Sequence, residues 1–191
     1  MTRDSFHEED PIGLKTLESF AEAKRFNKWL YESIAGYCSG QVLEIGSGIG
    51  NLSLLLFDNK KSTNITLSDL RESYCAVLRK RFKDQSKLTG IHQVDLSIPD
   101  FPQRYAALLG KFDTIIALNV VEHIKEDDVA IANCKSLLQP GGRLVVLVPA
   151  FQWLYNSLDK ELGHYRRYSR KKLVVLLHGA GLTIKDTKYF N

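Results

Sequence analysis

The chain has 191 residues, a formal net charge of +4 and 44% hydrophobic residues. This length suits one domain with a sizeable core, and the composition excludes a disordered, a collagen-like or a disulfide-stapled chain. The longest apolar run, residues 144–151, is far shorter than the ~20 residues of a membrane-spanning helix, and the first ten residues lack the apolar stretch of a secretory signal. The three cysteines, Cys38, Cys75 and Cys134, lack metal-ligand spacing, so we expect reduced thiols in a cytoplasmic protein.

Residues 1–19 are polar and contain Pro11 and Gly13, which predicts a mobile arm ahead of a single domain over residues 20–191. A helical pattern of apolar residues follows from Phe20 to Ile34. The predicted strands are 41–45, 64–68, 91–94, 112–119, 143–148 and 182–190, and the later predicted helices are 52–57, 70–82, 102–109, 126–138 and 169–178. This alternation predicts an α/β fold: a doubly wound, mostly parallel, Rossmann-like sheet flanked by helices, with a ligand site at the carboxyl ends of its strands.

The loop after the first predicted strand carries glycines at alternate positions, where the backbone can approach a ligand closely. The glycines alone fit a tight strand-to-helix turn equally well, and their GxGxG spacing differs from the GxGxxG of nicotinamide and flavin folds. Polar residues also stand at the ends of four predicted strands: Glu44, Asp69, Asp95 and Asn119. Together they point to one nucleoside-like ligand, because an acid at a strand end can bind both hydroxyls of a ribose.

Five sequence motifs together resemble the class I S-adenosylmethionine-dependent methyltransferases. They are VLEIGSGIGNLS at 42–53, LSDL at 67–70, VDLS at 94–97, FDTIIALNVVEHI at 112–124 and LLQPGGRLVVLVP at 137–149. The motifs follow one another in the order and spacing of that family. The resemblance implies S-adenosyl-L-methionine as the cofactor and S-adenosyl-L-homocysteine as its product.

The resemblance also implies roles for individual residues. The methionine part of the cofactor would pass over Gly46, Ser47 and Gly48, with its amino group facing Glu44, and Asp69 would bind the ribose. The full implied set comprises Glu44, Gly46, Ser47, Gly48, Asn51, Asp69, Asn119 and His123, together with Leu70, Asp95 and Leu96 at the adenine. For His123 we favour the simpler alternative, in which the ring caps or packs against the following helix.

The segment after the fifth predicted strand contains the sequence GHYRRY, and it resembles a stretch of a bacterial methyltransferase group often found near glycosyltransferase and cell-envelope genes. Loops at this end of a sheet commonly carry functional residues. His164 and Tyr165 are the candidates for catalysis, because a histidine can accept a proton from an acceptor. Arg166 and Arg167 are candidates for binding a substrate phosphate or carboxylate. The alternative is a solvated basic run that ends at Ser169, the N-cap of the next helix.

The sequence after the fourth predicted strand excludes several methyltransferase subclasses. Residues 118–121 read LNVV. In the family that the chain resembles, the enzymes that methylate amino groups of adenine or glutamine carry an Asn/Asp-Pro-Pro-aromatic motif at this place. No cysteine stands there for a covalent route to 5-methylcytosine, and no carboxylate cluster beyond the cofactor acids predicts a metal. Asp113 begins a strand and is interpreted as a turn residue. Trp29 and Tyr31 either pack in the core, which we favour, or close over the cofactor.

The predicted strand at 182–190 is only the sixth, whereas the resembling family has seven, the last slotted beside the sixth. We therefore expect a fold shortened after its sixth strand, with an open sheet edge through which the chain could oligomerise. Truncation or natural shortening is the favoured explanation. A strand from another chain and cover by the N-terminal arm are the alternatives.

The resulting hypothesis is an S-adenosylmethionine-dependent methyltransferase that acts on a small or lipid- or sugar-linked anionic acceptor. The main alternative is a cofactor-binding module that is inactive or needs a partner. A third hypothesis is an RNA methyltransferase, in which the basic run 164–172 contacts RNA while Tyr165 and Tyr168 stack on bases. The modest net charge disfavours this third hypothesis.

Overall fold

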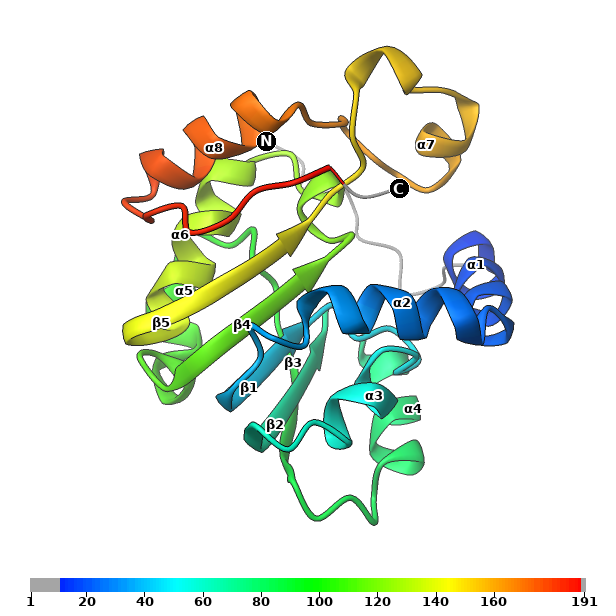
Figure 1. Cartoon of the computed structure of the whole chain (residues 1–191), viewed down its shortest axis with the longest axis vertical. Coiled ribbons are helices and arrows are strands. Elements are labelled where there is room, and N and C mark those ends of the chain that lie inside the picture. Colours follow the sequence, from blue (N-terminus) through cyan, green and yellow to red (C-terminus); the bar gives the residue numbers. More distant parts are fainter. Residues whose placement is uncertain (1–10, 190–191) are drawn as a thin grey trace.

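A computed structural model describes residues 11–189 of the chain. Its centre is a five-stranded, all-parallel sheet with the order β3-β2-β1-β4-β5 and helices on both faces (Figure 1). The strands are β1 (Gly40–Ile45), β2 (Ser62–Asp69), β3 (Leu88–Gln93), β4 (Phe112–Leu118) and β5 (Leu138–Leu147). The helices are α1 (Pro11–Glu22), α2 (Lys24–Ile34), α3 (Ser53–Phe57), α4 (Glu72–Arg81), α5 (Phe101–Arg104), α6 (Asp127–Leu137), α7 (Ser157–Glu161) and α8 (Arg170–Gly179), with short 3-10 turns η1 (Ala106–Leu108), η2 (Val121–His123) and η3 (Gln152–Leu154).

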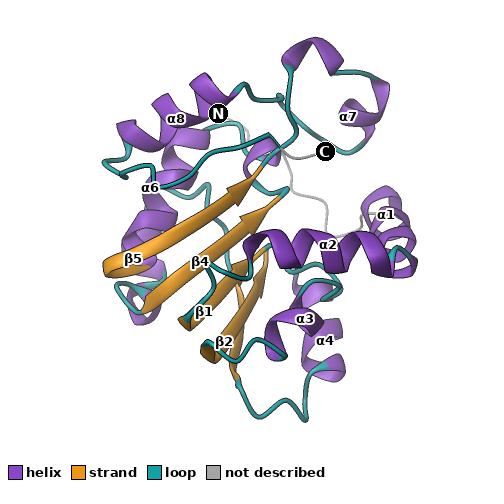
Figure 2. Ribbon diagram, viewed as in Figure 1, coloured by secondary structure: helices purple, strands orange, loops and turns teal. Residues whose placement is uncertain are grey.

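The central strands carry apolar residues on both faces, as expected for a buried parallel sheet. Helices lie on both sides of this sheet (Figure 2). Leu43 and Ile115 belong to a core cluster that includes residues of α5 and α6. Val42 and Ile116 belong to a second cluster, built with α2, α3 and α4. Because side chains alternate along a strand, neighbouring residues of β1 and β4 anchor the two opposite layers.

The strand order reverses at β1, which pairs with β2 on one side and β4 on the other. At its carboxyl end, Ile45 is level with Ser68 of β2 and Ala117 of β4. In open α/β sheets a ligand binds in the crevice at such a reversal. The fold therefore brings the loops after β1, β2 and β4 to one place.

The N-terminal part of the described chain is helical from Pro11, and the mobile arm expected over residues 1–19 stays a prediction. Proline is compatible with the first turn of a helix, where its missing N–H would have no partner. The helical pattern expected from Phe20 to Ile34 is split, because α1 ends at Glu22 and α2 begins at Lys24. Residues 1–10 of the expected arm lie outside the described residues.

The sixth strand predicted for residues 182–190 is absent from the described residues up to 189, which form no regular structure there. Within that part of the chain, β5 pairs only with β4, so no backbone ladder forms on its outer edge. The segment is held instead by side chains. Tyr37 donates a hydrogen bond from its hydroxyl to Asp186 Oδ2 at 2.6 Å, and the rings of Phe151 and Tyr189 stack at 4.7 Å. Alternating apolar residues therefore did not suffice to make a strand.

The three cysteines are buried and none forms a disulfide, as expected. Within residues 11–189, no helix combines the length and the apolar character needed to cross a membrane.

Candidate functional site

The glycine loop follows β1 and turns sharply over the carboxyl end of the sheet. Gly46 and Gly48 have φ angles of 69° and 55°, in the left-handed region that favours glycine. Ser47 donates its backbone N–H to the carbonyl of Ser68 at 2.8 Å, and Gly48 donates its N–H to Asp69 Oδ2 at 2.8 Å. These two hydrogen bonds hold the loop against Ser68 and Asp69, the last two residues of β2.

Helix α1 covers this loop. A Cβ atom at Gly48 would lie 3.0 Å from the side chain of Leu17, and Asn51 Nδ2 donates to the Leu17 carbonyl at 2.8 Å. Between the loop and the two N-terminal helices lies a cavity of about 150 Å³. Its lining includes the predicted residues Glu44, Gly46, Ser47, Asn51 and Asn119 and the apolar residues Leu17, Phe20, Phe26 and Leu30. The predicted helical pattern contained Phe20, Phe26 and Leu30, but nothing in the sequence showed which side of the sheet this face would cover.

Glu44 is the most deeply buried polar residue on the cavity wall, with 4% of its surface exposed. The Ser53 hydroxyl donates a hydrogen bond to its Oε2. Burial raises the pKa of Glu44 to about 7, and hydrogen bonds from Ser53 and Ser47 only partly oppose this rise. No cationic side chain of the described residues forms an ion pair with this carboxyl group.

Two further predicted acids end the neighbouring strands. Asp69, with 6% exposure, accepts the backbone N–H of Gly48 through one carboxylate oxygen and that of Arg71, at 3.0 Å, through the other. Burial raises the pKa of Asp69, although these hydrogen bonds oppose it. Asp95 Oδ1 accepts hydrogen bonds from the backbone and hydroxyl of Ser97. The two predicted adenine-side leucines lie beside these acids: Leu96 is buried and Leu70 is half-buried.

Asn119 follows β4 with a φ angle of 53°, a left-handed conformation that asparagine tolerates better than most residues. This bend leads into η2, where Glu122 is fully buried and His123 is exposed. Burial raises the pKa of Glu122 to about 8, and Asp159 adds to the rise. Among the residues that the structure describes, both carboxylate oxygens of Glu122 lack a hydrogen-bond partner. Sequence analysis missed Glu122, because the motif that contains it also reads as an apolar helix start.

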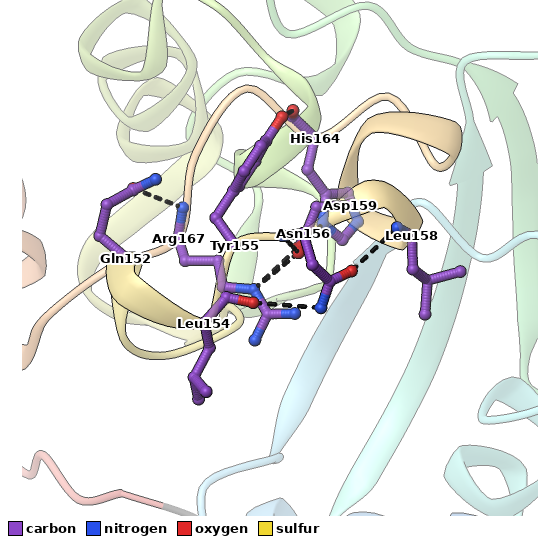
Figure 3. A network of polar contacts seen from close by, with 8 residues as sticks. All are labelled: Gln152, Leu154, Tyr155, Asn156, Leu158, Asp159, His164 and Arg167. Atoms are coloured by element: carbon purple, nitrogen blue, oxygen red, sulfur yellow. Dashed lines mark hydrogen bonds and ion pairs between the residues drawn. The ribbon is translucent and has the colours of Figure 1, made fainter.

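The segment 151–169, here named the α7 segment, is organised around Asp159 (Figure 3). This carboxylate is 1% exposed and accepts a bifurcated hydrogen bond from the Nε–H of Arg167, with its two oxygens at 2.8 and 3.0 Å. It also contacts His164 Nδ1 at 2.9 Å and accepts the backbone N–H of Asn156 at 2.9 Å, which completes a capping box at the start of α7. Arg167 above all holds the pKa of Asp159 well below its usual range.

The two arginines predicted to bind substrate are both paired with acidic residues of the protein. Arg167 is paired with Asp159, while Arg166 forms an ion pair with Asp127 at 2.7 Å and donates to the Lys125 carbonyl. A substrate anion would have to compete with these partners, so their role in binding substrate stays a prediction. Tyr165 is exposed and also stays a prediction.

The structure removes one support of the RNA hypothesis. Tyr168 is 4% exposed, and its hydroxyl donates to Asp127 Oδ2 at 2.8 Å, so this ring is not available to stack on a base. The prediction that Ser169 caps the following helix is confirmed, because its hydroxyl accepts the backbone N–H of Lys172 at 3.2 Å. Some residues of the basic run 164–172 therefore bind other parts of the chain instead of facing solvent.

The sequence suggested roles for three other residues, Trp29, Tyr31 and Asp113. Tyr31 is half-buried against the core cluster of α2, α3 and α4, which confirms the core interpretation. Trp29 is 38% exposed and its ring lies 5.8 Å from that of Phe26, so the core interpretation is wrong for this residue. Neither lines the cavity. Asp113 lies in β4 and accepts the backbone N–H of Gln41 in β1 at 2.8 Å, so it joins two strands and the turn interpretation is wrong.

Comparison with known proteins agrees with this geometry. The family model described as a methyltransferase domain matches residues 43–144. A ubiquinone biosynthesis O-methyltransferase from Xanthomonas euvesicatoria is 28% identical over 159 residues, covering 76% of this chain and 64% of that protein. Among solved structures, an S-adenosylmethionine-dependent methyltransferase from Aquifex aeolicus has a TM-score of 0.66 at 17% identity, covering 91% of this chain and 88% of the other. The trans-methyltransferase CalH in complex with SAH has a TM-score of 0.63 at 19% identity, covering 83% and 52%.

The chain therefore belongs to the methyltransferase-domain family, as a class I S-adenosylmethionine-dependent member. It spans 35% and 64% of the lengths of the first two curated relatives that it matches.

The residues at the site fit the cofactor of this family. Gly46 gives the cavity wall a stretch without a side chain, and Glu44 is a buried acid that has no cationic partner among residues 11–189. Asn51 Oδ1 is also buried without a hydrogen-bond partner. An amino acid joined to a nucleoside supplies a cation, hydrogen-bond donors and a ribose for such groups.

Proposed function

We propose that this chain transfers a methyl group from S-adenosylmethionine to a small acceptor that is anionic and linked to a lipid or a sugar. The observation that carries the cofactor part is Glu44. A carboxyl group with 4% exposure, beside a cavity and without a cationic partner, is expensive to ionise unless a ligand brings the positive charge. The amino group of the methionine part has that charge.

The remaining contacts follow from the strand ends. In this proposal the carboxylate of Asp69, already oriented by Gly48 and Arg71, accepts the ribose hydroxyls, while Asp95 and the Leu96 amide bind the adenine. When bound, the cofactor supplies an electrophilic methyl group on a sulfonium. The chain orients that group and excludes water with the apolar side chains of α1 and α2, since positioning is the main contribution to such a displacement.

The α7 segment is the proposed acceptor side. His164 has Nδ1 directed to Asp159, so its Nε2 is the nitrogen that can accept a proton from an acceptor hydroxyl. Tyr165 is exposed beside it. Exposed Lys160, Lys171 and Lys172 give this side positive charge, which supports an anionic acceptor more directly than the internally paired arginines do.

A transfer assay with methyl-labelled S-adenosylmethionine tests this function. The acceptor panel would contain a phenol, a sugar carboxylate and a lipid-linked phosphate, each incubated with the wild-type chain and with Asp69→Ala. The proposal expects label in an anionic lipid- or sugar-linked acceptor, and much less with the variant. Label in the phenol alone would contradict the acceptor class and leave methyl transfer intact.

A second candidate is a cofactor-binding module whose activity needs a further domain or partner. The observation in its favour is coverage, because the chain spans only part of the length of its curated relatives. This candidate predicts binding of S-adenosylhomocysteine without transfer to any acceptor in the panel. Failure of the wild-type chain to bind S-adenosylhomocysteine would contradict both candidates.

A further inference from the structure

Three side chains that could ligate a metal converge on the acceptor side of the fold. Glu122 and His123 come from η2, and His164 comes from the loop after α7. Each offers one ligand atom, and the three atoms lie within 4.8 Å of one another. The backbone joins the two segments, because Tyr165 donates its N–H to the carbonyl of Glu122 at 2.8 Å. The backbone contact that holds the loop after α7 against η2 therefore also brings the three side chains together.

The carboxyl group of Glu122 is buried at this point of convergence. Glu122 is 0% exposed, and within residues 11–189 neither of its carboxylate oxygens has a hydrogen-bond partner. An orphaned buried polar group is costly, and proteins almost always satisfy such groups with a partner, a water or an ion. Arg167 and Arg166 lie on the same segment as His164, yet both are committed to Asp159 and Asp127.

The surroundings of His164 match those of a metal-bound histidine. Its Nδ1 contacts Asp159 Oδ1 at 2.9 Å, and Asp159 is itself held by Arg167. A carboxylate behind a histidine fixes the ring orientation and leaves the other nitrogen as a ligand, which is the usual arrangement around protein metals. The ring of His123 meets that of His164 edge to face, with centroids 4.6 Å apart. Both imidazoles thus border the same small volume as Glu122.

We propose that Glu122, His123 and His164 bind a divalent transition-metal cation. A donor set of two imidazoles and one carboxylate suits Zn²⁺ or Fe²⁺, whereas Mg²⁺ prefers oxygen ligands alone. Bonds of about 2.0–2.2 Å require the three donors to close slightly around the ion. The sequence had predicted no metal, because two of these ligands lie in one motif and the third in a distant one.

The site keeps open coordination positions, since only three ligands come from the described residues. With the metal bound, His164 Nε2 is a ligand and does not act as the base; an open position can instead bind an acceptor oxygen and lower the pKa of its hydroxyl. This role toward an acceptor rests on the proposed function. The proposed metal site depends only on the positions of Glu122, His123 and His164.

The test is a Zn²⁺ titration of the metal-free chain against a chromogenic competitor, with Co²⁺ as a spectroscopic substitute that reports nitrogen ligands. The variants are Glu122→Gln, which keeps the shape of the buried side chain, and His164→Asn. The control is His178→Asn, which removes an exposed histidine on α8 outside the cluster. Circular dichroism checks that each variant is folded.

The proposal expects one equivalent of Zn²⁺ to bind the wild type and His178→Asn alike. Glu122→Gln and His164→Asn should each bind at least about tenfold more weakly, since even removal of a supporting partner costs 10–100-fold in metal affinity. Absence of saturable binding to the wild type would overturn the site, as would equal affinity in a folded Glu122→Gln variant. Because no cofactor or acceptor is present, neither result bears on the proposed methyl transfer.

Discussion

Glu44 at the glycine loop and Asp159 in the α7 segment are both buried carboxylates, yet their surroundings are opposite. Asp159 is paired with Arg167 and hydrogen-bonded to His164, which hold its pKa well below its usual range. Glu44 has hydroxyl groups for partners, and burial raises its pKa to about 7. The charge of Asp159 is thus satisfied within the chain, and the charge of Glu44 is not.

This difference separates a structural acid from a ligand-binding acid. Asp159 connects Asn156, His164 and Arg167, so it holds the α7 segment in one conformation. Glu44 borders a cavity and, in the proposed function, ionises fully only when a cation binds beside it. By the same criterion Glu122, buried and unpartnered, belongs with Glu44.

The largest expected effect is on stability at Asp159. Asp159→Ala leaves Arg167, 19% exposed, without its carboxylate and removes the capping box of α7. We expect the free energy of unfolding to fall by about 3 kcal/mol, as for other broken buried pairs. Urea unfolding at neutral pH measures it, with Glu161→Ala on the exposed side of the same helix as control. Equal stability of the two variants would show that Asp159 is not the organising residue.

The next effect is on cofactor affinity at Asp69. Asp69→Ala removes the acceptor of the Gly48 N–H and the proposed ribose ligand. Loss of charge-assisted hydrogen bonds costs about 1.5–3 kcal/mol, or roughly 10- to 150-fold in affinity for S-adenosylhomocysteine. Calorimetry compares this variant with Asp84→Ala, which changes an exposed acid elsewhere. A similar affinity in both variants would place the ribose somewhere else.

Glu44 predicts a dependence of stability on pH. Its folded pKa of about 7 lies above the ordinary 4.5, so between these values the folded state binds more protons than the unfolded state. Stability from this group is therefore complete below about pH 4.5 and is lost as pH rises toward 7. Relative to wild type, Glu44→Gln should gain roughly 1–3 kcal/mol between pH 5 and pH 8. Unfolding midpoints at both pH values measure the change, and parallel curves for the two proteins would contradict the buried, unpaired state.

A smaller effect is expected where the α7 segment ends. Ser169→Ala removes the hydroxyl that accepts the Lys172 N–H, which should lower the free energy of unfolding by about 1 kcal/mol. Ser86→Ala, in an exposed loop, is the matched control. Thermal unfolding would distinguish them, and no difference would mean that α8 is held by its packing alone.

The comparison also explains which parts could be predicted from the sequence. The residues around Glu44 are close in sequence to strand ends, and parallel strands bring their carboxyl ends together, so the glycine loop, Asp69 and Asp95 could be placed in advance. The cover by Leu17 could not, because Pro11 and Gly13 read as breaks in a segment that is in fact helical.

The α7 segment was less predictable for a different reason. Its charges pair over long stretches of chain, as Arg166 does with Asp127, and sequence alone cannot tell a paired arginine from one that awaits a substrate. The strand predicted at 182–190 is not formed in the described residues, since a strand needs a neighbouring strand to pair with as well as an alternating pattern.

The most direct test of the central claim is a calorimetric titration of S-adenosylhomocysteine near pH 6.5, run in two buffers of different ionisation enthalpy. A cationic amino group placed against Glu44 should lower the pKa of this carboxyl from about 7, so that the wild type releases a proton on binding and Glu44→Gln releases none. Binding with the same heat in both buffers would contradict the assignment of Glu44 to the cofactor. Absence of binding would contradict the site itself.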